Sequence, residues 1–178
     1  MDVMPTLREI DHSQGSLSAM LSIMIYGSYQ CPQAGQAHRT TQELRDSLGD
    51  RLCLIFRHYP MPEAYPLAQT AAETAEAAGA QGKFWEMHNK LFANQNALDE
   101  ASLVKYASEL DLEISTFLHD ISHNVHTPRI QSDIDSAADY SVEESPTFFI
   151  SVRHKGSANL VALVKQILVA TLAHSGEG

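Results

Sequence analysis

The apolar residues fall into three short continuous runs, at residues 21–26, 52–56 and 147–152. Each run is rich in β-branched or aromatic residues, and turn-forming residues follow the first two. Continuous apolar runs of this length are typical of strands that are covered on both faces, as in a parallel sheet between helices. The pattern therefore predicts a buried sheet with at least these three strands.

A helix is predicted between the first two strands. Pro32 is favoured at a first helical position, and Ala37, Leu44 and Leu48 then form one apolar stripe that ends before Gly49. Strand, helix and strand in this order form a βαβ unit. We therefore expect parallel strands and a right-handed crossover.

Helical periodicity dominates residues 64–142, which contain no pattern typical of strands. Asp99 is the expected N-cap of one helix, and Pro128 opens the last. Outside this insertion, residues 1–19 are predicted to be an arm with little structure, and residues 153–156 a short strand or a turn. The predicted helices cover residues 65–79, 83–92, 100–110, 113–124, 130–140 and, at the end of the chain, 160–168.

Composition narrows the class of protein. The 178 residues suit a single domain, with a core at about 20–62 and 143–173 and the helical insertion between them. A formal net charge of −10 argues against binding to nucleic acid or to an anionic membrane surface. No secretory signal begins the sequence and no apolar run reaches about 18 residues, so the expected location is cytoplasmic.

The candidate for chemistry is Cys31, which lies between the first strand and the following helix, directly before Pro32. Unpaired N–H groups and the partial positive charge of a helix start favour a thiolate, which is the nucleophilic form of cysteine. The other cysteine, Cys53, lies in the second predicted strand and is interpreted as a small core residue, too distant for a disulfide with Cys31.

The order of these elements, with four local motifs, resembles the DsbA-like branch of the thioredoxin superfamily. The resemblance covers roughly residues 11–172. It implies an α/β thioredoxin-like fold with an all-helical insertion. The motifs are Tyr-Gly-Ser-Tyr-Gln-Cys-Pro at 26–32, Phe-Arg-His-Tyr-Pro at 56–60, Gln-Gly-Lys-Phe-Trp-Glu-Met-His at 81–88 and Ser-Pro-Thr-Phe-Phe-Ile at 145–150.

The resemblance also implies roles for individual residues. Cys31 matches the attacking cysteine, and Pro146 matches a cis-proline that faces it. Ser145 would offer backbone groups to an extended substrate, as in strand addition. Pro32 and Gln33 are expected to complete the substrate site.

Three departures from the family pattern are present. The family's C-x-x-C motif ends here in Ala34, so the resolving thiol is missing; Ala34 is either natural or an engineered replacement. The hairpin after Phe149 lacks the usual Asn-Gly. Glu143 and Glu144 replace glycines before Pro146, and their charges would oppose thiolate formation.

Histidines offer two further hypotheses. His58 ends the second strand at the active edge of the sheet and could tune Cys31, although a capped loop histidine is the preferred interpretation. The histidines at 119, 123 and 126 are spaced for one helix face, but they lack the supporting ligands of a zinc site. No metal and no resident cofactor are predicted.

The sequence therefore favours a thiol–disulfide oxidoreductase that works through a single cysteine. Its partners would be a cysteine-containing protein or peptide, with glutathione as a co-substrate; the oligomeric state is not predicted. One alternative is a redox-inactive module that binds peptides or proteins through the same groove. A further alternative is a glutathione-linked transferase or isomerase, for which Arg57 is the nearest candidate cation.

Overall fold

The computed structural model describes residues 4–153 together with Ala162 and Val164. Its sheet has four strands in the order β1-β3-β2-β4. β2 (Leu21–Gly27) and β3 (Leu52–His58) run parallel, with Cys53 beside Ser22. β4 (Thr147–Val152) pairs antiparallel with β2, and β1 (His12–Gln14) pairs antiparallel with β3. The predicted strands and the parallel βαβ unit are confirmed.

The short strand β1 was not predicted. Residues 1–19 were expected to be an unstructured arm, because they carry no apolar run. His12 nevertheless pairs with Phe56, and Gln14 pairs with Leu54. Backbone pairing at an exposed sheet edge does not need apolar side chains, so hydrophobic patterning does not reveal such a strand.

Helices lie on both faces of the sheet. α1 (Pro32–Leu48), followed by the 3₁₀ turn Gly49–Arg51, packs Leu44 and Leu48 against Ile23 and Leu54. Alternate sheet residues point the other way, where Met24 and Ile55 meet Ala137 of α6 (Thr127–Asp139). Covered faces on both sides explain why the strands have continuous apolar sequences.

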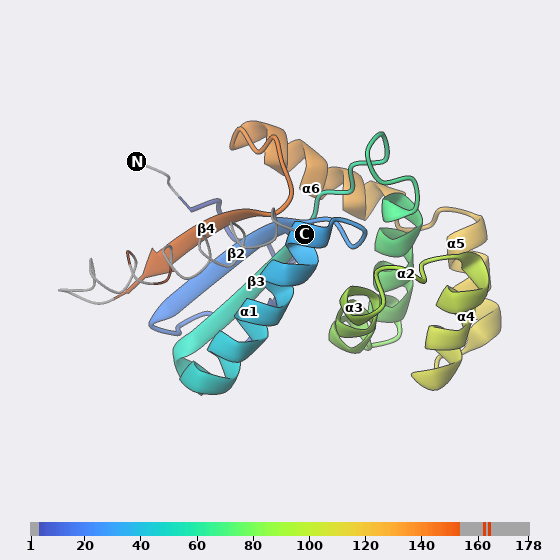
Figure 1. The fold of residues 1–178 in the computed structure, drawn as a ribbon, viewed down its shortest axis with the longest axis horizontal. Coiled ribbons are helices and arrows are strands. Elements are labelled where there is room, and N and C mark those ends of the chain that lie inside the picture. Colours follow the sequence, from blue (N-terminus) through green and yellow to red (C-terminus); the bar gives the residue numbers. More distant parts are fainter. Residues whose placement is uncertain (1–3, 154–161, 163, 165–178) are drawn as a thin grey trace.

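The helical insertion stands beside the sheet in Figure 1, and α6 leads the chain back to it. Side chains from these helices join Tyr29 and Phe56 in one core, so the insertion and the sheet share buried surface. Asp99 caps α4 as predicted, by accepting from the Ser102 N–H. The insertion consists of α2 (Ala68–Ala80), α3 (Phe84–Ala93), α4 (Glu100–Glu109), α5 (Ile114–Ser122) and α6.

The C-terminal predictions lie mostly outside the described residues. This applies to the short strand or turn at 153–156 and to the closing helix at 160–168, of which only Ala162 and Val164 are described, both helical. Buried Val164 packs with Leu21 and Leu52. Within the described part of the chain, no helix is both long and apolar enough to cross a membrane.

Candidate active site

Cys31 is the N-cap residue of α1. Its backbone is extended, at φ −74° and ψ 121°, and Pro32 follows at the first helical position. The Cys31 N–H donates to Ser28 O at 3.2 Å, and the Gly35 N–H donates to Cys31 O at 3.1 Å. The sulfur therefore lies at the end of the helix that carries partial positive charge, as the sequence predicted.

The segment before β4 faces this cysteine. The Ser145–Pro146 peptide bond is cis. Cys31 Sγ lies 3.1 Å from Ser145 O, to which the thiol donates. The Ser28 N–H donates to Ser145 Oγ at 2.9 Å, which attaches this segment to the loop after β2. The fold thus brings Cys31, at the start of α1, together with Ser145 and Pro146, which lie directly before β4.

Two side chains border the sulfur directly. Gln33 Oε1 is 3.3 Å from Cys31 Sγ and competes with Ser145 O for the single thiol hydrogen. Tyr65 contacts the sulfur from the loop before α2. A hydrogen bond with Cys31, and then burial, raises the pKa of Tyr65 above the ordinary phenol value. The sequence pointed to Gln33 but not to Tyr65, which it placed at the start of the predicted helix 65–79; α2 begins only at Ala68, and Tyr65 lies in the loop before it.

Two hollows flank the cysteine and share Tyr65 as a wall. Cys31 itself is 1% exposed and lines neither hollow, but its neighbours Pro32 and Gln33 line one each. One has a volume of about 400 Å³ and is lined by Gln33, Met61, Ala64, Tyr65, Glu144, Ser145 and Pro146. The other, of about 570 Å³, is lined by Gln30, Pro32, Arg39, Tyr65, Leu67, Gln95, Asn96 and Leu98.

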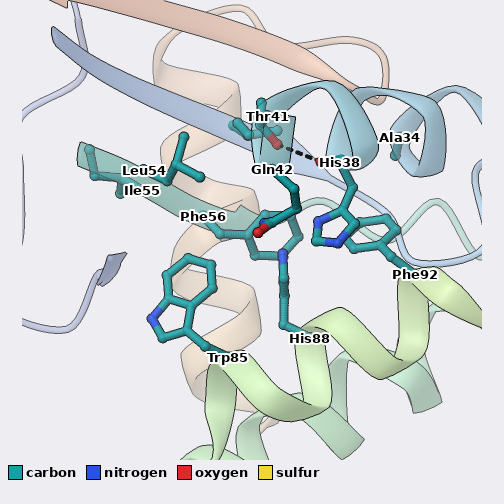
Figure 2. A pocket seen from close by; sticks show the side chains of 11 residues that line it. Ala34, His38, Thr41, Gln42, Leu54, Ile55, Phe56, Trp85, His88 and Phe92 are labelled. Atoms are coloured by element: carbon teal, nitrogen blue, oxygen red, sulfur yellow. Dashed lines mark hydrogen bonds between the residues drawn. The ribbon is translucent and has the colours of Figure 1, made fainter. Parts of the chain in front are cut away.

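Ala34 occupies the position of the missing thiol. It is 3% exposed and belongs to the core shared with the insertion. Figure 2 shows Ala34 at one end of a narrow cavity, with His38 and Phe92 beside it. Ala34 thus packs in the apolar core, and the cavity that it lines also contains the polar side chains of His38, Thr41 and Gln42.

Gln95 supports the cysteine loop from the other side. Its Nε2 donates to Tyr29 O at 2.8 Å and to Cys31 O at 2.7 Å. A Cβ added at Gly35 would lie 2.0 Å from Gln95 Oε1, so glycine is needed there for the close approach. The sequence missed this support, because Gln95 lies in a polar loop segment that is typical of a turn.

The three residues proposed to tune Cys31 (Glu143, Glu144 and His58) have different surroundings. Glu144 is exposed and lines the smaller hollow beside Gln33, whereas exposed Glu143 is not among its lining residues. His58 is fully buried, and its Nε2 lies 2.8 Å from Glu76 Oε1. The Nε2 of His58 is thus bonded to Glu76 rather than to the Cys31 sulfur, and the tuning of Cys31 by His58 stays a prediction.

Arg57 is not placed as a cation for glutathione. The side chain is fully buried, and its Nη2 donates to Asp11 Oδ2 at 2.7 Å. Its Nη1 donates to the Tyr26 hydroxyl at 2.7 Å. The sequence-based suggestion is corrected: Arg57 joins the N-terminal segment to the sheet, whereas Arg39 lines the larger hollow at the active site.

Cys53 is a core residue, as predicted. Both cysteines are free, and Cys53 is fully buried near Ile55 on the α6 side of the sheet. Burial raises the pKa of the Cys53 thiol. Because Cys53 lies beside Ser22 and Cys31 lies beyond the other end of β2, the two sulfurs are on different levels of the sheet.

The histidines of α5 form small local contacts. The rings of His119 and His123 stack with centroids 4.3 Å apart, and both residues are exposed. His126 Nε2 lies 3.1 Å from Asp120 Oδ2, a pairing that the sequence did not predict. Asp120 thus supports His126 in a surface contact at the end of α5.

The cysteine at a helix start, opposite the segment before β4 and covered by a helical insertion, defines a thioredoxin-like protein of the DsbA type. A family model described as Thioredoxin matches residues 8–167. The chain therefore belongs to the thioredoxin family, and the resemblance found in the sequence is confirmed.

Solved structures share this fold. A thioredoxin-like oxidoreductase from Silicibacter pomeroyi DSS-3 is 20% identical, with a TM-score of 0.73; the match covers 89% of this chain and 93% of that one. Oxidised BdbD from Bacillus subtilis is 16% identical, with a TM-score of 0.75, and the match covers 95% of this chain and 96% of that one.

Among curated proteins, the chain is 40% identical over 162 residues to the Na(+)/H(+) antiporter NhaA 1 of Salinispora arenicola. That match covers 90% of this chain but 25% of the antiporter. The chain thus spans about a quarter of the length of the curated relatives it matches. The comparisons do not support the predicted cytoplasmic location.

Proposed function

We propose that this protein exchanges disulfides through the single cysteine Cys31. The observation that carries the proposal is the 3.1 Å contact between Cys31 Sγ and Ser145 O. Because of this contact, the sulfur at the start of α1 lies beside a segment able to hold an extended peptide. The likeness to the thioredoxin-like oxidoreductase from Silicibacter pomeroyi supports this chemistry.

The reaction has two exchange steps. The Cys31 thiolate attacks one sulfur of a substrate disulfide, the S–S bond breaks, and the displaced sulfur leaves as a thiolate that takes a proton from water. Cys31 is then joined to the substrate by a mixed disulfide. A second thiolate attacks this bond and releases Cys31, so that one disulfide has been exchanged for another without net oxidation.

The second thiol comes from outside the chain. Ala34 cannot resolve the mixed disulfide, and Cys53 is buried on the α6 side of the sheet. We assign this step to glutathione or to a second cysteine of the substrate. Arg39 lines the larger hollow near Pro32 and offers a cation to a glutathione carboxylate.

Substrate recognition would use the Ser145–Pro146 segment. An extended peptide could reach Cys31 through the smaller hollow, where Ser145 and Pro146 form one wall and Tyr65 another. Main-chain hydrogen bonds give affinity with little dependence on sequence. A cysteine-containing protein or peptide with an accessible disulfide is therefore the proposed substrate class.

The proposal is tested by incubating the protein with glutathione disulfide and measuring its intact mass. We expect one glutathionyl adduct on the native chain and on Cys53→Ser, and none on Cys31→Ser. With a glutathionylated peptide as the substrate, added reduced glutathione should then release Cys31 from its mixed disulfide, so that the protein turns over repeatedly. An unmodified Cys31, or an adduct that no thiol removes, would overturn the proposal.

A second candidate function is a binding module without redox turnover. It is favoured by Ala34, whose apolar surroundings resemble ordinary core packing. In this case Cys31→Ala should bind reduced partner peptides as tightly as the native chain does. If affinity is lost together with the sulfur, exchange chemistry is the better account.

A further inference from the structure

A second cluster of reactive side chains lies apart from Cys31, where β1, β3 and α2 meet. His12 Nε2 and His58 Nε2 each lie 2.8 Å from Glu76 Oε1. The three ligand atoms all lie within 4.8 Å of one another. These residues come from positions far apart in the sequence, which is why the spacing of histidines along the chain did not reveal them.

Two imidazoles and one carboxylate form a donor set that is common for zinc and related divalent metals. Ligand atoms about 2.1 Å from a tetrahedral metal are separated by roughly 3.3 Å. The 2.8 Å contacts around Glu76 Oε1 would therefore have to open by about half an ångström, which small side-chain rotations can supply.

The ring of His58 makes a hydrogen bond through only one of its two nitrogens among the described residues. Its Nδ1 is buried and has no hydrogen-bond partner among the described residues, so no second contact fixes which ring nitrogen carries the proton. Nε2 can therefore present a lone pair at the cost of the single hydrogen bond to Glu76. The neighbouring backbone N–H of His58 donates to Asp133 Oδ2 at 2.8 Å and holds the residue in place.

An arginine, Arg129, lies close to the Glu76 carboxylate. Arg129 Nε is 3.9 Å from Glu76 Oε1, whereas Arg129 Nη1 lies only 2.6 Å from Asp133 Oδ1. Because Asp133 is the closer partner of Arg129, Glu76 Oε1 has its short contacts with the two histidines rather than with the arginine.

The cluster is accessible from one side. His12 is half-buried and lines a hollow of about 300 Å³, together with Asp11, Ser13 and Glu86. Its ring stacks on Phe84, with centroids 3.3 Å apart and planes at 6°, and this contact fixes the orientation of the ring. Glu76 and His58 are buried and do not line this hollow, so a metal ion would reach them past His12.

We propose that His12, His58 and Glu76 bind one divalent transition-metal ion of the zinc class, with water from the hollow as a further ligand. The site would link β1 to β3 and α2. Metal binding should therefore raise the stability of the fold and order the N-terminal segment. The proposal does not depend on the redox chemistry of Cys31.

The test must remove other metal-binding groups first. The background protein is Cys31→Ser/His119→Gln/His123→Gln, which lacks the active-site thiol and the stacked histidine pair on α5. After treatment with a chelator, it is titrated with CoCl₂ and ZnCl₂. We expect one equivalent of Co²⁺ with the d–d absorption of a four- or five-coordinate site, displacement by Zn²⁺, and a higher melting temperature with Zn²⁺.

Adding His12→Gln to this background should abolish the Co²⁺ spectrum, with an unchanged circular dichroism spectrum as the control for folding. A second measurement needs no variant: Zn²⁺ should protect His12 of the native chain from diethyl pyrocarbonate, as mapped by mass spectrometry. The proposal is overturned if the background protein binds no metal, if His12→Gln still binds it, or if Zn²⁺ leaves His12 equally reactive.

Discussion

The thiol of Cys31 donates to the carbonyl oxygen of Ser145, and the two atoms are 3.1 Å apart. Gln33 Oε1, 3.3 Å from the same sulfur, is a second acceptor for the single thiol hydrogen. The start of α1 and the Tyr65 hydroxyl also border the sulfur. The reactivity of Cys31 therefore depends on a balance between contacts that single substitutions can change.

Tyr65→Phe should slow the alkylation of Cys31. The variant keeps the ring that forms the wall between the two hollows and removes only the hydroxyl that forms a hydrogen bond with Cys31. A hydrogen bond of about 1 kcal/mol corresponds to a several-fold lower rate at neutral pH. The rate is measured with iodoacetamide over a range of pH. Tyr59→Phe, on the same loop but packed against the core on the α6 side, is the matched control and should not change the rate.

Ala34→Cys should convert the protein into a dithiol. A cysteine one helical turn from Cys31 lies close enough for a disulfide, and the cavity beside Ala34 offers room for the added sulfur. Oxidation by glutathione disulfide should then end in an internal disulfide, seen as loss of the glutathionyl adduct without added thiol. Ala37→Cys, one turn further along α1, is the control and should keep the adduct. Retention of the adduct in Ala34→Cys would show that the pair cannot close.

The strands and helices of the core could be predicted, because burial on both faces of the sheet and on one face of each helix leaves a periodic pattern. The position of Cys31 followed from the same pattern, since the residue between a predicted strand and the helix that follows it must lie at the start of that helix. The facing residues Ser145 and Pro146 came from family resemblance rather than from periodicity.

The remaining site residues could not be predicted, for physical reasons. Tyr65 and Gln95 act from irregular loops, and their positions depend on how the helical insertion packs against the sheet. Glu76 lies in an alanine-rich helix, where a glutamate is expected to face water; in the structure it is 6% exposed. The contacts of Arg57 with Asp11 could not be anticipated, because the N-terminal segment showed no pattern of its own.

Gln95→Ala should loosen the loop that holds Cys31. It removes both donors to the carbonyl oxygens of Tyr29 and Cys31, which are then left without these partners in a part-buried site. The loss should cost about 1–3 kcal/mol in the free energy of unfolding. Chemical denaturation measures the cost, and faster alkylation of Cys31 would report the greater freedom of the loop.

Asn96→Ala is the matched control for this substitution, because Asn96 is an exposed neighbour that lines the same hollow. It should leave both the stability and the alkylation rate close to those of the native chain. Equal effects of the two substitutions would contradict the assigned role of Gln95, since they would reflect a general disturbance of the loop.

His38 should make the fold sensitive to mild acid. Burial, followed by the charges of Arg39 and Arg45, lowers the pKa of His38 from 6.5 to about 4. Between these values the unfolded chain binds a proton that the folded protein does not, so stability must fall as the pH drops from 6.5 to 4. The contribution of this residue is at most about 3 kcal/mol.

His38→Gln should therefore reduce the dependence of the unfolding free energy on pH within this window. Urea denaturation at about pH 7 and about pH 4.5 measures it. Some dependence should remain, because burial also lowers the pKa of His88. The exposed His123 provides the control His123→Gln, which should keep the native dependence on pH. If His38→Gln keeps it as well, His38 is protonated in the folded protein, and the acid sensitivity in this window must come from another buried histidine such as His88.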